Sequence, residues 1–316
     1  MIIMGDDGFD PYAWHVGDPS DWGDGLAGVP DIPYMGYLHN GDDDEENDSD
    51  TIIDSRFIKR DEYSKKAWDY YLEFKEEDAL YYIDLALDLD KSHSNNWNIK
   101  AIILEGMKRY QESEECYNRS LELSKSNVVY DNKARMLRAW AGHLLSESRE
   151  KPNGLATLEE ALEKNSNAIN ALSQGGEESI ERFLSQKRVI ESNIKYEKEY
   201  QKNVETLKTY DKSELFTIAG RQFYKINMQL TPGMSLKLVK EPDNEFDKDA
   251  IAVYVEDRKA GYVANNNYTK FELTSSASEL QSKIKNVAHG EYLVYLLRLT
   301  DPEYPDIQFY IGRIIK

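Results

Sequence analysis

The sequence predicts a multidomain α plus β protein, and three observations lead to this prediction. Residues 1–50 hold 14 Asp or Glu and no Lys or Arg. From about residue 60, small and large side chains recur with a period of 34. From residue 215, the chain changes to short runs rich in Val, Ile, Tyr and Leu. We therefore expect a disordered acidic tail, an α-solenoid, a long helix and a small β-barrel with an inserted helix.

The net charge of −19 is unevenly distributed along the 316 residues. The segment 214–316 has 14 acidic and 13 basic residues, so its net charge is only −1. The acidity therefore belongs mainly to the N-terminal segment and does not exclude a polyanion-binding site elsewhere. Cys116 is the one cysteine, which excludes a disulfide within the chain and a thiolate metal site.

The first segment, residues 1–58, is predicted to be a disordered tail because acidic residues repel one another and periodic apolar positions are few. Five aromatic residues between positions 12 and 37 leave two interpretations open, a solubilising tail or a segment that docks on a partner. No apolar run is long enough to span a membrane and no secretion signal opens the chain. We expect a soluble, cytoplasmic protein that does not associate with membranes.

Residues 59–172 are predicted to form helical repeats in three units, 60–93, 94–127 and 135–168. Positions 8, 20 and 27 of each unit are small, and positions 11 and 24 are large. In the unit 94–127 these positions, together with 4 and 17, are Trp97, Ala101, Leu104, Tyr110, Ser113, Tyr117 and Ser120. Seven extra residues, 128–134, precede the third unit and are expected to extend a helix or loop.

This spacing resembles that of the tetratricopeptide repeat (TPR), in which small residues let two helices of a hairpin approach closely. Three such hairpins would stack into a short solenoid that binds a protein partner on its concave face. Lys91, Lys125 and Ser166 occupy position 32, where the family prefers Pro. A generic helical bundle is the alternative, but agreement of consecutive units at a period of 34 favours the repeat.

Residues 177–212 are predicted to form a long helical spacer because the segment is polar and its stretch 177–211 lacks Pro and Gly. Apolar residues occur at heptad-like intervals, but Lys187, Glu197 and Gln201 interrupt them. A helix that caps the solenoid is therefore favoured over a self-associating coiled coil.

The segment 214–316 is predicted to be a small barrel of the OB or SH3-like kind. The expected strands are residues 216–219, 235–240, 251–256, 260–264, 292–299 and 308–315. A helix is expected over about 268–286.

Motifs in this segment closely resemble the HIRAN domain. They comprise an opening at Ala219-Gly220, a centre over residues 236–253 that contains Pro242, Asn244, Phe246-Asp247 and Ala250-Ile251, and a continuation at Gly261-Tyr262-Val263. The resemblance implies a domain that captures the 3′ end of single-stranded DNA. It implies that Phe223 and Phe246 stack on bases, that Asp247 accepts the 3′-hydroxyl, and that Asp243 and Asn244 are polar loop positions.

Two departures from the family pattern bear on this expectation. Gln222 stands where the family has an arginine, with Arg221 beside it, and both stacking aromatics are Phe where the family has Tyr. The candidate phosphate contacts are Arg221, Lys240, Lys248 and Lys270. A purely turn-forming role for Asn244 and Asp247 remains the alternative.

The sequence shows no phosphate-binding loop, no zinc-ligand grouping and no catalytic constellation. We therefore expect a non-enzymatic adaptor without a cofactor, whose repeats bind an unidentified protein and whose barrel binds single-stranded DNA or other nucleic-acid ends. DNA repair or replication-fork maintenance is the expected setting. The alternative is a protein–protein scaffold that has no nucleic-acid ligand.

Overall fold

The computed structural model describes residues 55–151, 154–224, 230–298 and 307–315. They form two compact units that divide between Glu191 and Ser192. The predicted tail, residues 1–58, lies outside the described residues up to position 54. The last four residues of the predicted tail, 55–58, are helical, so the predicted boundary is corrected to residue 54. The helix is favoured there because the ring of Phe57 lies 5.1 Å from the guanidinium of Arg60, one turn along it.

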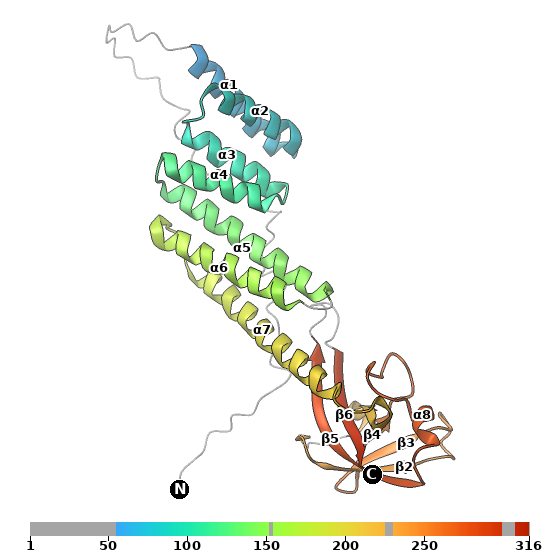
Figure 1. Ribbon diagram of the computed structural model, residues 1–316. Helices are drawn as coiled ribbons and strands as arrows, with labels where there is room; N and C mark the ends of the chain where they lie inside the picture. Colours follow the sequence, from blue (N-terminus) through green and yellow to red (C-terminus); the bar gives the residue numbers. More distant parts are fainter. Residues whose placement is uncertain (1–54, 152–153, 225–229, 299–306, 316) are drawn as a thin grey trace, which may run out of the picture. The chain divides into compact units, whose positions relative to one another are not determined.

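The first unit consists of helices that stack as antiparallel hairpins (Figure 1). They are α1 (Ser55–Leu72), α2 (Glu76–Leu89), α3 (Ser94–Gly106), α4 (Tyr110–Leu123), α5 (Asn127–Glu150), α6 (Leu155–Gly175) and the first part of α7 (Glu181–Leu207). Each predicted repeat unit contains one helix pair, so the predicted TPR-like solenoid is confirmed. The seven extra residues before the third unit lie in α5 and lengthen it.

The period of 34 is also visible in the backbone of the turns. Phe74 and Lys108, which are 34 residues apart, both adopt positive φ, at 56° and 57°. The next amide in each turn donates to an equivalent carbonyl: Lys75 N to Tyr70 O at 3.0 Å, and Arg109 N to Leu104 O at 2.9 Å. The first two hairpins therefore share one turn geometry as well as one side-chain pattern.

Small residues lie where the helices of a hairpin touch. Ala67, Ala79 and Ala101 are fully buried, as are Ser113 and Ser120. The two serine hydroxyls donate to backbone carbonyls across the hairpin, Ser113 to Ala101 O at 2.8 Å and Ser120 to Ser94 O at 2.9 Å. These bonds satisfy polar groups that would be costly to bury unpaired.

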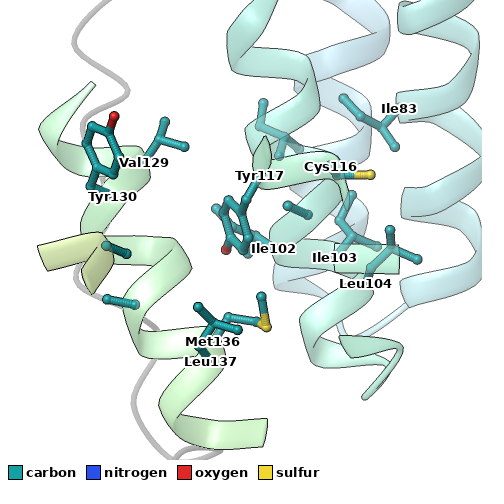
Figure 2. Close-up of a cluster of buried hydrophobic side chains, with 14 of the residues drawn as sticks. Ile83, Ile102, Ile103, Leu104, Cys116, Tyr117, Val129, Tyr130, Met136 and Leu137 are labelled. Atoms are coloured by element: carbon teal, nitrogen blue, oxygen red, sulfur yellow. The ribbon is translucent and has the colours of Figure 1, made fainter. Parts of the chain in front are cut away.

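Large side chains fill the space between successive hairpins. Figure 2 shows the ring of Tyr117 between the helix that carries Met136 and Leu137 and the helices that carry Ile103 and Ile83. All five side chains are fully buried. The core of the helical unit is thus continuous across its hairpins, as expected for a solenoid.

The first part of α7 covers the last hairpin. Phe183 is buried there, and the buried Gln186 accepts a bond from Asn165 at 2.7 Å and donates to the carbonyl of Arg138 at 3.0 Å. The predicted long helix is present but is shorter than predicted. It begins at Glu181, four residues after the predicted start, and ends at Leu207, five residues before the predicted end. A short 3-10 turn, Lys212–Glu214, follows it.

The second unit contains a closed antiparallel barrel in the order β1-β4-β3-β2-β5-β6. The strands are β1 (Leu215–Ala219), β2 (Ser235–Lys240), β3 (Ile251–Val255), β4 (Arg258–Val263), β5 (Val287–Arg298) and β6 (Ile307–Ile315). The predicted small barrel is therefore confirmed. β5 begins five residues earlier than predicted because it pairs with β2 as well as β6.

Alternation along the strands fills the barrel. In β2, Leu236 and Leu238 are buried and Lys237 is exposed. The glycine of β4, Gly261, has a φ of 152°, and a Cβ on it would come within 2.4 Å of the carbonyl oxygen of Ala219. Only glycine lets β4 lie this close to β1 at the end of the barrel where both strands lead into loops.

The inserted helix predicted over 268–286 is wrong in length. The structure has only α8 (Ala277–Gln281), which begins with a capping box between Ser276 and Glu279. The chain before it pairs with β1: Phe271 N donates to Thr217 Oγ1 at 3.0 Å, and Ser275 N donates to Leu215 O at 2.8 Å. These bonds with β1 compete with helix formation.

Within the described parts of the chain, no helix combines the length and apolar character needed to cross a membrane. The same residues include no cluster of three His, Cys, Asp or Glu side chains that could hold a metal ion.

Burial of Glu105 in the helical unit predicts a measurable pH dependence. Burial raises its pKa to about 7, although the hydrogen bond from Tyr117 and the nearby Arg135 oppose the shift. The folded state thus binds this proton more tightly than the unfolded state, where the pKa is 4.5. The contribution of Glu105 to stability therefore falls as the pH rises from about 4.5 to 7.

We predict that Glu105→Gln stabilises the protein at about pH 8 by on the order of 1–3 kcal/mol and has little effect at about pH 4. Denaturant unfolding followed by far-UV circular dichroism at both pH values measures this difference. Glu115→Gln, an exposed position on α4, is the matched control and should change neither value. A Glu105→Gln effect of equal size at both pH values would contradict the prediction.

Candidate nucleic-acid interface

An open hollow of about 560 Å³ lies at the end of the barrel where β1 and β4 lead into loops. Four aromatic and two amide side chains make up half of its lining. The lining residues are Ala219, Gly220, Phe223, Tyr224, Phe246, Asp247, Tyr262, Val263, Ala264, Asn265, Asn266 and Thr269. Three of the predicted site residues, Phe223, Phe246 and Asp247, are therefore brought together by the fold.

Phe246 projects from the loop between β2 and β3 and is 97% exposed. The side chain of Asn244 shapes this loop, since its Oδ1 accepts from the backbone N–H of Phe246 at 3.0 Å and of Asp247 at 3.2 Å. Such an Asx turn fixes the backbone locally without packing the ring. The predicted turn-forming role of Asn244 is thus observed, and its effect is to present Phe246 to solvent.

Asp247 uses its two carboxylate oxygens on different neighbours. Oδ1 accepts from the backbone N–H of Asp249 at 2.8 Å, and Oδ2 accepts from Asn265 Nδ2 at 3.0 Å. A carboxylate has about four acceptor positions, so each oxygen can accept one more donor. The loop after β4 therefore orients the carboxylate while leaving it able to bind a hydroxyl.

Phe223 reaches the hollow from the turn after β1. Gly220 adopts a left-handed conformation with a φ of 75° and starts a short 3-10 turn, Arg221–Phe223. This reversal places Phe223 at the hollow with 79% of its surface exposed. An exposed phenyl ring offers a face on which a base can stack.

The predicted cationic contacts are not part of the lining. The guanidinium of Arg221 lies 4.1 Å from the centre of the Tyr310 ring. Lys240 Nζ donates to Gln281 O at 2.6 Å and Lys270 Nζ donates to Thr274 O at 3.3 Å, so both amines are held at backbone carbonyls. Lys248 is exposed.

Gln222 and Asp243 are exposed and likewise lie outside the lining. Of the eight site residues expected from sequence, the fold thus places three at the hollow and one, Asn244, directly behind it. The other four lie on the same loops or, for Lys240, on the adjoining strand.

Sequence reasoning missed three side chains, Glu241, Lys259 and Tyr262, that join Asn244 in supporting the loop of Phe246. The four side chains form one hydrogen-bonded group. We call them the Glu241 network: Glu241, Asn244, Lys259 and Tyr262. Lys259 Nζ lies 2.7 Å from both Glu241 Oε1 and the Tyr262 hydroxyl, which donates to Glu241 Oε2 at 2.8 Å. Asn244 Nδ2 donates to Glu241 and to Tyr262, each at 3.3 Å.

The pKa shifts in this network agree with an ion pair. Burial alone would lower the pKa of Lys259, but its hydrogen bonds to Glu241 and Tyr262 outweigh burial and raise the pKa above its usual value. Burial alone would raise the pKa of Glu241, but hydrogen bonds from Lys259, Tyr262 and Asn244 lower it below 4.5. The pair is therefore charged at neutral pH. Tyr262 could have been suspected earlier, because it belongs to the Gly261-Tyr262-Val263 motif.

A family model matches part of this unit. Residues 213–276 match the HIRAN domain, so the predicted HIRAN domain is confirmed. The match includes the hollow and ends before β5 and β6, which close the barrel. No curated protein matches the chain.

Solved structures similar to the chain include TPR domains. The Arabidopsis OM64 TPR domain is 11% identical, with 44% of this chain and 99% of that chain covered and a TM-score of 0.31. The second TPR domain of human RPAP3, solved with an HSP70 peptide, is 12% identical over 43% and 96%, with a TM-score of 0.29. The TPR2B domain of yeast Sti1, in a pHsp70 complex, is 15% identical over 43% and 98%, with a TM-score of 0.27.

The Glu241 network predicts a stabilisation that depends on pH. Because the pKa of Glu241 is lowered in the folded state, its contribution is complete well above pH 4.5 and is lost as the pH falls through the folded value. Lys259→Met keeps the aliphatic stem and removes the ammonium. We predict that it destabilises the barrel by roughly 1 kcal/mol at neutral pH and that this difference shrinks at about pH 3.

Denaturant unfolding monitored by the NMR signals of barrel residues measures the difference. Lys237→Met, at an exposed lysine on β2 whose amine lies 3.9 Å from Asp257, is the control and should have a smaller effect. A Lys259→Met penalty that persists unchanged at low pH would show that the charge of Glu241 is not the source of the stabilisation.

Proposed function

We propose, on the premise that the barrel is a HIRAN domain, that this chain is a non-catalytic adaptor for single-stranded DNA ends. Its barrel would bind the 3′ end of a strand, and its TPR-like helices would bind a protein partner. Any ATPase or nuclease activity would come from that partner. DNA repair or replication-fork maintenance is the setting that we propose.

The observation that carries the proposal is the placement of Phe223, Phe246 and Asp247 around one hollow. Two phenyl rings that are mostly exposed are costly in water, and a nucleobase that stacks on them would remove that surface from solvent. Stacking is tolerant of sequence because every base has a π face, at roughly 1–3 kcal/mol per base. The rings alone would thus bind any single strand.

Asp247 supplies the preference for an end. Its carboxylate can accept a hydrogen bond from a free 3′-hydroxyl, which the interior of a DNA strand does not have. A 3′-phosphate would instead bring negative charge against the carboxylate, at an energetic cost. Asn265 Nδ2 donates to Asp247 Oδ2 at 3.0 Å, so the carboxylate that accepts the 3′-hydroxyl is oriented before the strand binds.

Electrostatics should contribute less here than in most nucleic-acid sites. Among the described lining residues, Asp247 is the only charged one. The number of phosphates neutralised sets the salt dependence of binding, so we expect a shallow dependence on salt concentration.

The helical unit supports the second half of the proposal. Stacked hairpins create an extended surface, and repeat proteins of this architecture use such surfaces to hold partners. The alternative function, a protein–protein scaffold, is favoured because the described lining residues include no Lys or Arg and because aromatic and amide groups also suit a peptide. Binding of single-stranded DNA separates the two functions.

We predict that the wild-type protein binds a 5′-labelled single strand with a free 3′-hydroxyl more tightly than the same strand with a 3′-phosphate. Fluorescence anisotropy measures both affinities. Phe246→Ala should weaken binding to both strands by about 5- to 150-fold, the equivalent of one lost stacked base. Phe74→Ala, at a 76% exposed phenylalanine in the helical unit, is the matched control and should bind like the wild type.

Asp247→Asn retains the shape of the side chain and should bring the two affinities close together. Equal affinity of the wild-type protein for both strands would reject end capture, and no binding to either would favour the scaffold. Circular dichroism of each variant checks that the loss does not come from unfolding.

A further inference from the structure

Tyr268 is a third exposed aromatic side chain beside the hollow. It is 93% exposed, comparable with Phe246 at 97% and Phe223 at 79%. No ring contact or side-chain hydrogen bond involves Tyr268 within the described part of the chain. Asn266, two positions before it, and Thr269, the next residue, line the hollow. The turn that carries Tyr268 therefore borders the candidate site, and the exposed ring lies outside its lining.

The turn that carries Tyr268 is fixed by local hydrogen bonds. Asn266 Oδ1 accepts from the backbone N–H of Tyr268 at 2.8 Å. Asn266 O accepts from the backbone N–H of Thr269 and of Lys270, each at 3.0 Å. This is the same device that presents Phe246, in which an asparagine side chain holds the backbone of the exposed aromatic residue two positions later.

Both ends of the turn are anchored to the barrel. On one side, Asn265 donates to Asp247 Oδ2 at 3.0 Å and accepts from Ser278 N at 3.0 Å. On the other side, the buried Phe271 donates its backbone N–H to Thr217 Oγ1. The turn is therefore joined directly to the carboxylate that would receive the strand end, and its position relative to Asp247 is determined by the fold.

We infer that Tyr268 stacks on a third nucleotide of the bound strand, adjacent to the two that Phe223 and Phe246 hold. The inference rests on the proposed function. The occupant is a nucleobase because the ring is aromatic, its backbone is held by Asn266, and its turn borders a hollow whose described lining residues include no cation. A ring whose backbone is already ordered loses little further conformational freedom when a base covers it.

A series of 5′-labelled oligothymidylates with free 3′-hydroxyls, from dinucleotide to hexanucleotide, tests this inference by fluorescence anisotropy. For the wild-type protein the affinity should increase from dinucleotide to trinucleotide. Tyr268→Ala should abolish that increase, with a loss of about 5- to 150-fold for trinucleotides and longer strands and no change for the dinucleotide. Tyr268→Phe keeps the ring and should bind like the wild type.

Tyr268→Ala affinities equal to the wild type at every length would overturn the inference and leave end binding intact. Equal losses for the dinucleotide and the hexanucleotide would also overturn it, because Tyr268 would then act on the end pocket itself. If the wild-type protein binds none of the strands, the proposed function fails and the inference fails with it. Val287→Ala, at an exposed position of β5, controls for general effects on the barrel.

Discussion

The candidate site depends on the side-chain amide of Asn244. Its oxygen accepts from the backbone of Phe246 and Asp247, and its nitrogen donates to Glu241 and Tyr262. One side chain thereby joins the exposed loop to the ion pair of Glu241 and Lys259. Because Asn244 is only half-buried, these bonds are made near water and each contributes modestly. Together they fix the loop without covering its aromatic ring.

Hydrogen bonds also fix the backbone of the other turns around the hollow and leave their aromatic rings exposed. Each exposed aromatic side chain is carried by a turn whose geometry comes from backbone or asparagine hydrogen bonds, and the two asparagine-held turns meet where Asn265 contacts Asp247. The rings are therefore free of packing while their backbones are ordered. Such preorganisation reduces the conformational entropy lost on binding, which suits a site that relies on shape and stacking more than on charge.

Much of the fold could be predicted because it depends on local spacing. The period of 34 identified the hairpins, since Ala67, Ala101 and their equivalents must be small wherever two helices touch. Short runs rich in Val, Ile, Tyr and Leu identified the barrel strands. The helix expected over 268–286 failed because Thr217 and Leu215, more than 50 residues earlier, bind the backbone of Phe271 and Ser275. No local pattern contains that information.

In the candidate site, too, features set by local sequence could be predicted and contacts between distant residues could not. Phe223, Phe246 and Asp247 could be predicted because a family motif surrounds them. Lys240 was expected near phosphates, but its amine binds Gln281 O, 41 residues away, and a sequence cannot show that contact. Lys259 was missed for the same reason, since its role comes from strand pairing that brings it to Glu241.

End capture requires that the hollow receives the 3′ end of a single strand. Photocrosslinking tests it most directly, with 5-iodouracil placed either at the 3′-terminal position or at the 5′ end of an otherwise identical oligonucleotide. Adducts are then mapped by mass spectrometry. If the hollow captures the 3′ end, the 3′-terminal probe forms adducts with Phe223 or Phe246 and the 5′ probe does not. Adducts confined to the helical unit, or the same adducts from both probes, would contradict it.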